Sequence, residues 1–460
     1  MAHAAQADAA AGHGPMLGWL GIIRLGLVQT ALGAIVVLTT STLNRVMVVE
    51  LALPAVLPGL LVGWHYAVQM SRPRMGYGSD VGRRRTPWII GGMAVLALGG
   101  LGAAASVAVM SVDTWAGIAL GLLAFTAIGA GVGASGTSLL TLLAKRVDPS
   151  RRAPAAATVW IMMIAGFVVT ATTAGQFLDP YTHLRLVAVT AVVCAIAFVL
   201  TVAAVWGLEG PGDPVDAQSA RQNAEKGHFW ATFKQIWGET QARRFTVFVF
   251  VSMLAYSAQD LILEPFAGAV FEMTPGQSTQ LSGMQHGGVL AGMLLVAVAG
   301  MVLKNKIGSL RTWAIGGCVA SAVALMGLVV GGLIGPAYPL KANVVFLGAA
   351  NGAFAVAAIG SMMSLAGQGQ KQREGTRMGL WGASQAIAFG LGGLMGTVAI
   401  DVTRLMIAEM AVAYGAVFAS QAALFLIAAV LAARIDKAGA TSRQVGLSPA
   451  AEGYATGVGG

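Results

Sequence analysis

Twelve apolar runs, each about the length of a membrane-spanning helix, follow one another along this chain. A helix needs roughly 20 mostly apolar residues to cross the hydrocarbon of a bilayer. The chain is 56% hydrophobic and 10% charged, whereas soluble domains have about 25% charged residues. We therefore expect an all-α membrane protein with 12 transmembrane helices. The predicted spans lie near 22–44, 52–71, 88–110, 116–143, 155–178, 184–207, 244–264, 280–303, 312–335, 342–366, 379–401 and 412–433.

A long polar interruption, from Glu209 to Arg244, separates two blocks of six runs. This division predicts two six-helix bundles related by an axis along the membrane normal. Residues 229–243 place aromatic side chains on one helical face, which indicates an amphipathic helix on the membrane surface, although a simple linker is the alternative. The expected parts are a disordered cytoplasmic tail (1–15), an N-terminal bundle (16–208), a linker (209–243), a C-terminal bundle (244–435) and a disordered cytoplasmic tail (436–460).

Basic residues predict the orientation of the chain. If the N-terminus is cytoplasmic, four of the 28 lysines and arginines lie outside, and the other 24 fall in cytoplasmic segments. The four are Arg45, Arg185, Lys341 and Arg404. Because cytoplasmic loops of membrane proteins are rich in Lys and Arg, we expect both termini in the cytoplasm. The net charge of +9 is then a topology signal, and we expect no nucleic-acid partner.

The loop after the second run has the sequence GYGSDVGRRR at 76–85. It resembles the loop signature of the major facilitator superfamily, G-x-x-x-D-x-x-G-R-[RK], but lacks one residue between Asp80 and Gly82. The resemblance implies the twelve-helix fold of that superfamily. A carboxylate and arginines in a tight turn can pair with neighbouring helix ends; the alternative is a merely basic loop that sets topology. The candidate latch residues are Gly76, Asp80, Gly82, Arg83 and Arg84.

Small residues recur at four-residue spacing in two runs, at Gly129 with Gly133 and at Gly392 with Gly396. This spacing lets the backbones of membrane helices approach closely. We expect tight helix packing at both pairs and no chemistry.

Ionisable side chains inside membrane helices are costly, so each is a candidate functional residue. Runs one and seven, which are equivalent in a six-plus-six repeat, both end in a polar pair followed four or five residues later by a glutamate and then a proline. The residues of this intramembrane polar cluster are Asn44, Arg45, Glu50, Gln259, Asp260 and Glu264.

The helical rise places Asp260 about 22 Å along the seventh helix from its cytoplasmic end, in the outer leaflet. Arg45 lies near the outer boundary of its own helix. The sequence therefore predicts an Arg45–Asp260 pair across the two bundles, in which each charge satisfies the other in low dielectric. The cluster either forms a functional site or only fastens the two halves together.

Two histidines, His65 and His286, lie inside predicted spans. A neutral imidazole can be the axial ligand of a metal centre, including the magnesium of a chlorophyll. The glycines beside His286 would leave room for a flat macrocycle. The alternative for each is a hydrogen bond to a neighbouring helix.

Motifs of catalysis are absent from the sequence. It has no His-Glu-x-x-His, no phosphate-binding Walker loop, no Gly-x-Ser-x-Gly and no Cys-x-x-Cys. The two cysteines, Cys194 and Cys318, lie deep in apolar runs and predict neither a disulfide framework nor a metal cluster. We expect no enzymatic activity and no metal site formed by the protein alone.

Three segments resemble the PucC family, the bacteriochlorophyll-delivery branch of the major facilitator superfamily. They are 42–51 (TLNRVMVVEL), 72–88, which contains the Asp80 loop, and 258–268 (AQDLILEPFAG). The similarity of arrangement extends from about Gly18 to Arg434. It implies an assembly factor for light-harvesting complexes in the inner (intracytoplasmic) membrane of a photosynthetic bacterium. The short Asp80 loop favours the peripheral-antenna branch of the family.

The same resemblance implies light-harvesting antenna polypeptides, bacteriochlorophyll, membrane lipid and bacteriochlorophyll synthase as partners. Bacteriochlorophyll would be a non-catalytic cofactor, with His65 and His286 as its candidate ligands. Two other functions stay open. A proton-coupled secondary transporter would use Asp260 and Glu264 as its coupling carboxylates, and a pigment-free scaffold would only organise antenna polypeptides.

Overall fold

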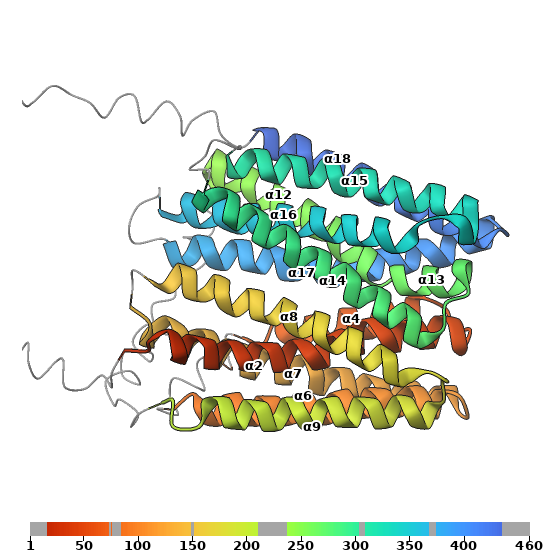
Figure 1. The fold of residues 1–460 in the computed structure, drawn as a ribbon, viewed down its shortest axis with the longest axis horizontal. Helices are drawn as coiled ribbons and strands as arrows, with labels where there is room; N and C mark the ends of the chain where they lie inside the picture. Colours follow the sequence, from red (N-terminus) through yellow and green to blue (C-terminus); the bar gives the residue numbers. More distant parts are fainter. Residues whose placement is uncertain are drawn as a thin grey trace, which may run out of the picture.

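A computed structural model describes residues 16–72, 75, 84–148, 151–209, 237–302, 309–367 and 374–434. Within these ranges the chain is helical apart from short connections, and the helices lie side by side, nearly parallel to the long axis (Figure 1). The first half contains α2 (Trp19–Val37), η1 (Leu38–Thr42), α3 (Leu43–Arg45), η2 (Val46–Glu50), α4 (Val56–Gln69), α6 (Thr86–Met110), α7 (Thr114–Arg146), α8 (Arg152–Leu178) and α9 (His183–Val205). The second half contains α12 (Thr240–Asp260), α13 (Leu263–Phe271), α14 (Pro275–Val302), α15 (Leu310–Ile334), η4 (Gly335–Ala337), α16 (Leu340–Gly367), α17 (Glu374–Met406) and α18 (Met410–Arg434).

Eleven helices of the described chain are long and apolar enough to cross a membrane. The predicted second span, 52–71, is the exception. Its helix α4 has 14 residues, about 21 Å at 1.5 Å per residue, because residues 51–55 are not helical and Ala52 has a φ of 50°. The structure therefore confirms an all-helical, multi-pass membrane protein and gives eleven spans by this measure where the sequence predicted twelve.

The first span is one continuous 32-residue helix, Trp19–Glu50. Two π-helical turns, η1 and η2, interrupt its α-helical hydrogen bonding. They contain Glu50 and flank Asn44 and Arg45, three of the six residues of the predicted polar cluster. Single π-helical turns inside α-helices are frequent at functional sites.

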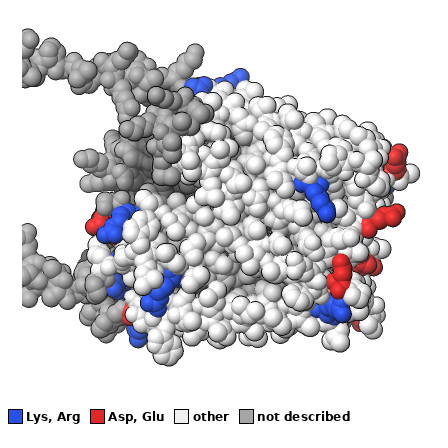
Figure 2. Space-filling model, viewed as in Figure 1, with Lys and Arg blue, Asp and Glu red and all other residues white. Residues whose placement is uncertain are grey.

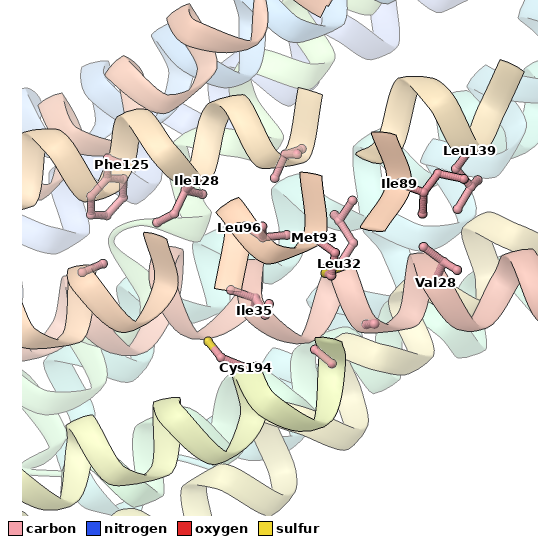
Figure 3. Packing of buried hydrophobic residues seen from close by; sticks show 14 of the residues in the cluster. Val28, Leu32, Ile35, Ile89, Met93, Leu96, Phe125, Ile128, Leu139 and Cys194 are labelled. Atoms are coloured by element: carbon pink, nitrogen blue, oxygen red, sulfur yellow. The ribbon is translucent and has the colours of Figure 1, made fainter. Parts of the chain in front are cut away.

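Buried apolar side chains form two large clusters. One comes almost entirely from the first half, where α2, α6, α7 and α9 pack around residues such as Ile35, Met93, Leu96 and Cys194 (Figure 3). The other comes almost entirely from the second half. The few members that cross over, such as Val48 and Leu261, lie in the two polar segments, so the halves interlock there.

Glycines set the closest helix contacts, as the sequence predicted for two pairs. A Cβ on Gly129 would lie 2.6 Å from the carbonyl oxygen of His65, and one on Gly396 would lie 2.6 Å from that of Ala258. Gly133 and Gly392 are similarly close to neighbouring residues. The expected tight packing at these four glycines is confirmed.

The bundle has two ends, which we name by the described chain. The terminal end contains the start of α2 and the end of α18, and the far end contains the ends of η2 and α8 and the start of α14 (Figure 1). Acidic side chains gather at the far end in the view of Figure 2. All of the polar contacts described next between the two halves lie toward this end or near the middle of the helices.

Candidate functional site

The two polar segments predicted from the sequence lie against each other. Asn44 and Gln259 are completely buried, and the Asn44 side chain donates a hydrogen bond to the backbone carbonyl of Leu261, at 2.5 Å. This contact joins the first and seventh spans at the turn between α12 and α13. The repeated segments therefore meet at the interface of the halves.

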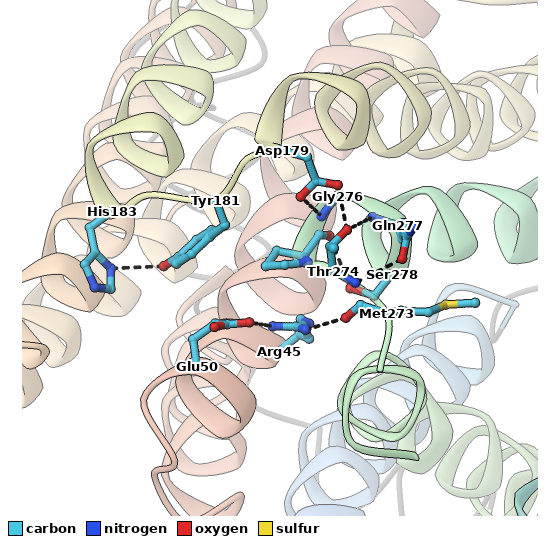
Figure 4. A network of polar contacts seen from close by, with 11 residues as sticks. Arg45, Glu50, Asp179, Tyr181, His183, Met273, Thr274, Gly276, Gln277 and Ser278 are labelled. Atoms are coloured by element: carbon cyan, nitrogen blue, oxygen red, sulfur yellow. Dashed lines mark hydrogen bonds and ion pairs between the residues drawn. The ribbon is translucent and has the colours of Figure 1, made fainter. Parts of the chain in front are cut away.

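The predicted Arg45–Asp260 ion pair is wrong. The Arg45 guanidinium binds the carboxylate of Glu50 through one terminal nitrogen and donates to the backbone carbonyl of Met273 through the other, at 2.6 Å (Figure 4). The π-helical turn η2 is the physical reason, because its wider turn brings residue 50 back beside residue 45. Pairing with a residue five positions away also costs less conformational entropy than pairing with a residue on a distant helix.

Tyr181 lies beside this pair, in the connection between α8 and α9. Burial raises the pKa of Tyr181 to about 12, and the negative charge of Glu50 adds to the shift. Its hydroxyl bonds to Nδ1 of His183 at 3.0 Å (Figure 4). Glu50 thus lies between Arg45, which it binds, and Tyr181 at the far end.

Glu264 lies at the centre of a cluster of hydroxyl groups. Its Oε1 accepts a hydrogen bond from Ser41, whose hydroxyl lies 3.1 Å from that of Ser282. About one helical turn before Ser282 on α14, the hydroxyl of Thr279 lies 3.0 Å from that of Thr42. These contacts join η1 of the first half to α13 and α14 of the second.

Asp260 faces a different surface. Its carboxylate interacts with the side chain of Gln285 on α14 and lies near the phenols of Tyr66 and Tyr256. The rings of Tyr66 and Tyr256 both pack against Phe389, with centroids 6.0 and 5.7 Å apart. Asp260 therefore belongs to an aromatic region between α4, α12 and α17, away from Arg45.

The two candidate ligand histidines differ in what their ring nitrogens contact. His65 contacts the Val62 carbonyl through Nδ1 at 3.0 Å and the Gln69 side-chain nitrogen through Nε2 at 2.7 Å, and Gln69 in turn accepts from Arg72. Both nitrogens of His65 are therefore engaged, so it is not available as a metal ligand in this conformation. The prediction of His65 as a pigment ligand therefore has no support from these contacts.

His286 keeps one nitrogen available. Its Nδ1 lies 2.9 Å from the Ser282 carbonyl, which favours the tautomer with a proton on Nδ1 and a lone pair on Nε2. Phe167 packs edge-on against the ring, with centroids 4.9 Å apart. A Cβ on the neighbouring Gly287 would meet nothing within 4 Å, whereas one on Gly288 would lie 2.3 Å from the Val345 carbonyl oxygen. Only the Gly287 side thus has space.

Two aspartates that were not predicted, one from each half, join the halves at the far end. Asp401 of α17 accepts from the backbone N–H groups of Ala55 and Val56, at 2.9 and 2.7 Å, where α4 begins. Asp179 accepts from the Thr274 hydroxyl and the Gly276 N–H, at 2.6 and 3.2 Å, where α14 begins (Figure 4). Each half thus caps a helix of the other. The sequence feature that could have predicted both caps is an aspartate at the end of the fifth and of the eleventh predicted span.

Most of the predicted latch lies outside the described residues, namely Gly76, Asp80, Gly82 and Arg83. Arg84 is described and is exposed. Next to it, Glu209 accepts from the backbone N–H groups of Arg85 and Thr86 at 2.7–2.8 Å and caps α6 at the terminal end. This cap was not predicted, although Glu209 lies just after the sixth predicted span.

Two further features are the linker segment and an apolar pocket in the described chain. Most of the amphipathic segment 229–243 lies outside the described residues, and its last four residues belong to α12, which begins at Thr240. A pocket of about 450 Å³ opens between α6 and α7 and is almost entirely apolar. Its lining consists of Met75, Pro87, Trp88, Gly91, Gly92, Val95, Ala130 and Ala134.

Solved structures of transporters share this fold. A bacterial homologue of the human drug peptide transporters PepT1 and PepT2 matches 93% of the chain and 99% of its own length, with a TM-score of 0.65 and 14% identity. A bacterial homologue of the human lysosomal transporter Spinster matches 90% of the chain and 96% of its own length, with a TM-score of 0.65 and 13% identity. At these identities the likeness shows a shared fold alone.

Relatives in sequence come from purple bacteria. The "Bacteriochlorophyll synthase 44.5 kDa chain" of Rhodobacter capsulatus is 53% identical over 93% of this chain and 98% of its own length. "Protein PucC" of Rhodobacter capsulatus is 30% identical over 91% of this chain and 92% of its own length. The family described as "PUCC protein" matches residues 42–440. The chain belongs to the PucC family.

Proposed function

We propose that this protein is a membrane assembly factor for bacterial light-harvesting complexes, which handles bacteriochlorophyll and guides antenna polypeptides without catalysing a reaction. The observation that carries the proposal is the family match over residues 42–440. The name of the 53% identical relative adds a link to bacteriochlorophyll. The higher identity to that relative than to PucC gives no support to the peripheral-antenna branch, so the proposal covers no particular antenna.

His286 is the residue that we propose as a bacteriochlorophyll ligand. Its ring is held by the Ser282 carbonyl, its Nε2 carries a lone pair in the favoured tautomer, and the adjacent Gly287 faces open space. These features fit a flat macrocycle whose magnesium needs one axial nitrogen. The bound pigment would supply light-absorbing chemistry, and the chain would supply only its ligand and an apolar surrounding.

The proposal includes an arrangement in the membrane. Twelve membrane helices in two six-helix bundles, with the terminal end toward the cytoplasm of a bacterial inner (intracytoplasmic) membrane, agree with the distribution of basic residues. The partners would be antenna polypeptides, bacteriochlorophyll, lipid and the enzyme bacteriochlorophyll synthase. The apolar pocket between α6 and α7 is the part of the described chain that we propose for an apolar partner.

A second candidate is a proton-coupled transporter. The observation that favours it is the transporter-like fold, together with the buried carboxylates of Asp260 and Glu264 at the interface of the halves. Purified protein that moves a solute into vesicles against a proton gradient, without pigment or antenna partners, would support this function. Co-purification of antenna polypeptides without pigment would instead point to a scaffold.

Deletion of the gene in a bacterium that makes bacteriochlorophyll tests the assembly function. We expect membranes of the deletion strain to lose antenna absorbance in the near infrared while bacteriochlorophyll is still made, and the wild-type gene to restore the bands. Normal antenna levels in the deletion strain would contradict the proposal. Accumulation of a bacteriochlorophyll precursor would also contradict it, because that result would place the chain in pigment synthesis.

A further inference from the structure

Six side chains that carry oxygen atoms gather at the interface between the halves, and we call them the oxygen cluster. Two come from the π-helical turn η1 and four from the second half. All six are less than 9% exposed. They are Ser41, Thr42, Glu264, Ser278, Thr279 and Ser282.

The contacts within this oxygen cluster leave part of it unsatisfied. Glu264 interacts with the hydroxyls of Ser41, Ser278 and Ser282. Its second oxygen, Oε2, is fully buried and has no hydrogen-bond partner among the described residues, and the same holds for Oδ1 of the nearby Asn44. A buried oxygen without a hydrogen-bond partner destabilises a folded membrane protein by a large free energy.

The charges near the cluster do not balance. Arg45 is the cation whose charge acts on Glu264, but its guanidinium binds Glu50 and the Met273 carbonyl. One cation therefore faces two carboxylates, so an ionised Glu264 requires a further counter-charge, and otherwise a proton neutralises it. A buried charge of this kind is strongly destabilising unless a counter-charge neutralises it.

The local backbone is also of a kind that binds ions. Secondary transporters bind coupling ions where a membrane helix departs from regular α-helical geometry. Here the π-helical turn η1 presents Ser41 and Thr42 toward the second half. Carboxylate and hydroxyl oxygens are the ligands that hard cations prefer.

We propose that this oxygen cluster binds a single monovalent cation, Na⁺, between Ser41 of one half and Glu264, Ser278 and Ser282 of the other, with the Thr42–Thr279 contact one turn away. The ion supplies the missing positive charge and accepts the lone pairs of Glu264 Oε2. Because its ligands come from both halves, the bound ion holds the far end closed. The site does not depend on pigment binding, so it can be tested separately from the proposed assembly function.

Thermal unfolding of the purified full-length protein in detergent tests the site. NaCl is titrated against choline chloride at constant ionic strength, and KCl is run in parallel. A ligand that binds only the folded state raises the unfolding midpoint with increasing concentration, so we expect the midpoint to rise with Na⁺. In Glu264→Gln the Na⁺ dependence should disappear.

A second variant keeps the test decisive if Glu264→Gln does not fold. Ser282→Ala retains the charge and removes one oxygen, so we expect the half-saturating Na⁺ concentration to rise about tenfold. Ser252→Ala is the matched control, because that buried hydroxyl bonds within its own helix, to Phe248 and Val249. Equal midpoints in NaCl and choline chloride would overturn the proposal. So would a midpoint that responds to pH but not to Na⁺, since Glu264 would then be neutralised by a proton.

Discussion

Replacing Gly292 with leucine is expected to abolish accumulation of the folded protein. Gly292 lies where α14 crosses α16, and a Cβ there would lie 2.0 Å from the backbone carbonyl oxygen of Ala349. On α16, Gly348 and Gly352 approach α14 equally closely, at Gln285 and Val289. The obstacle is backbone on both sides, so no side chain can move away. Overpacking of a well-packed core costs about 1–3 kcal/mol and sometimes more, and three interleaved glycines in contact with backbone place this case at the upper end.

The measurement is membrane yield and the thermal midpoint in detergent. Gly287→Leu is the matched control on the same helix, because a Cβ at Gly287 meets nothing within 4 Å. We expect the control to accumulate and to unfold near the wild-type temperature. Wild-type stability in Gly292→Leu would show that α14 and α16 do not cross as closely as described.

Substitution of Glu50 by glutamine is expected to have the second large effect. It leaves the Arg45 guanidinium, 3% exposed, without its carboxylate partner. Removal of one partner of a fully buried ion pair costs about 3–5 kcal/mol, mainly because the remaining charge stays buried; the Glu50 side chain is 32% exposed, which places the loss at or below the lower end of that range. We expect a correspondingly large fall in the unfolding midpoint of the purified protein.

The double variant Arg45→Met with Glu50→Gln separates charge burial from packing. If the penalty comes from an uncompensated charge, the double variant should be more stable than Glu50→Gln alone, as a double-mutant cycle would record. Additive losses from the two substitutions would contradict the pairing of Arg45 with Glu50 and would reopen the pairing with Asp260.

Hydropathy predicted much of the fold because the thickness of a bilayer fixes the length of its helices. It could not predict the break at 51–55, where Ala52 adopts a positive φ and α4 starts late. The family resemblance, carried by 42–51 and 258–268, was confirmed by the family match. The orientation of the chain and its tails remain predictions.

The candidate site was predicted in part. The sequence identified the two polar segments, and the structure brings them together through Asn44 and Leu261. It could not predict the partner of Arg45, because that partner depends on the π-helical turn η2. The caps made by Asp179 and Asp401 join residues 97 and 346 positions apart, and no periodicity in the sequence connects such positions.

A near-infrared absorption spectrum tests the central claim most directly. The protein is purified gently from a host that makes bacteriochlorophyll, as wild type and as His286→Leu, with His65→Leu as the matched control. We predict near-stoichiometric bacteriochlorophyll on the wild type and on His65→Leu, and loss or a spectral shift of the pigment in His286→Leu. Colourless wild-type protein from such a host would contradict the claim that this chain handles bacteriochlorophyll.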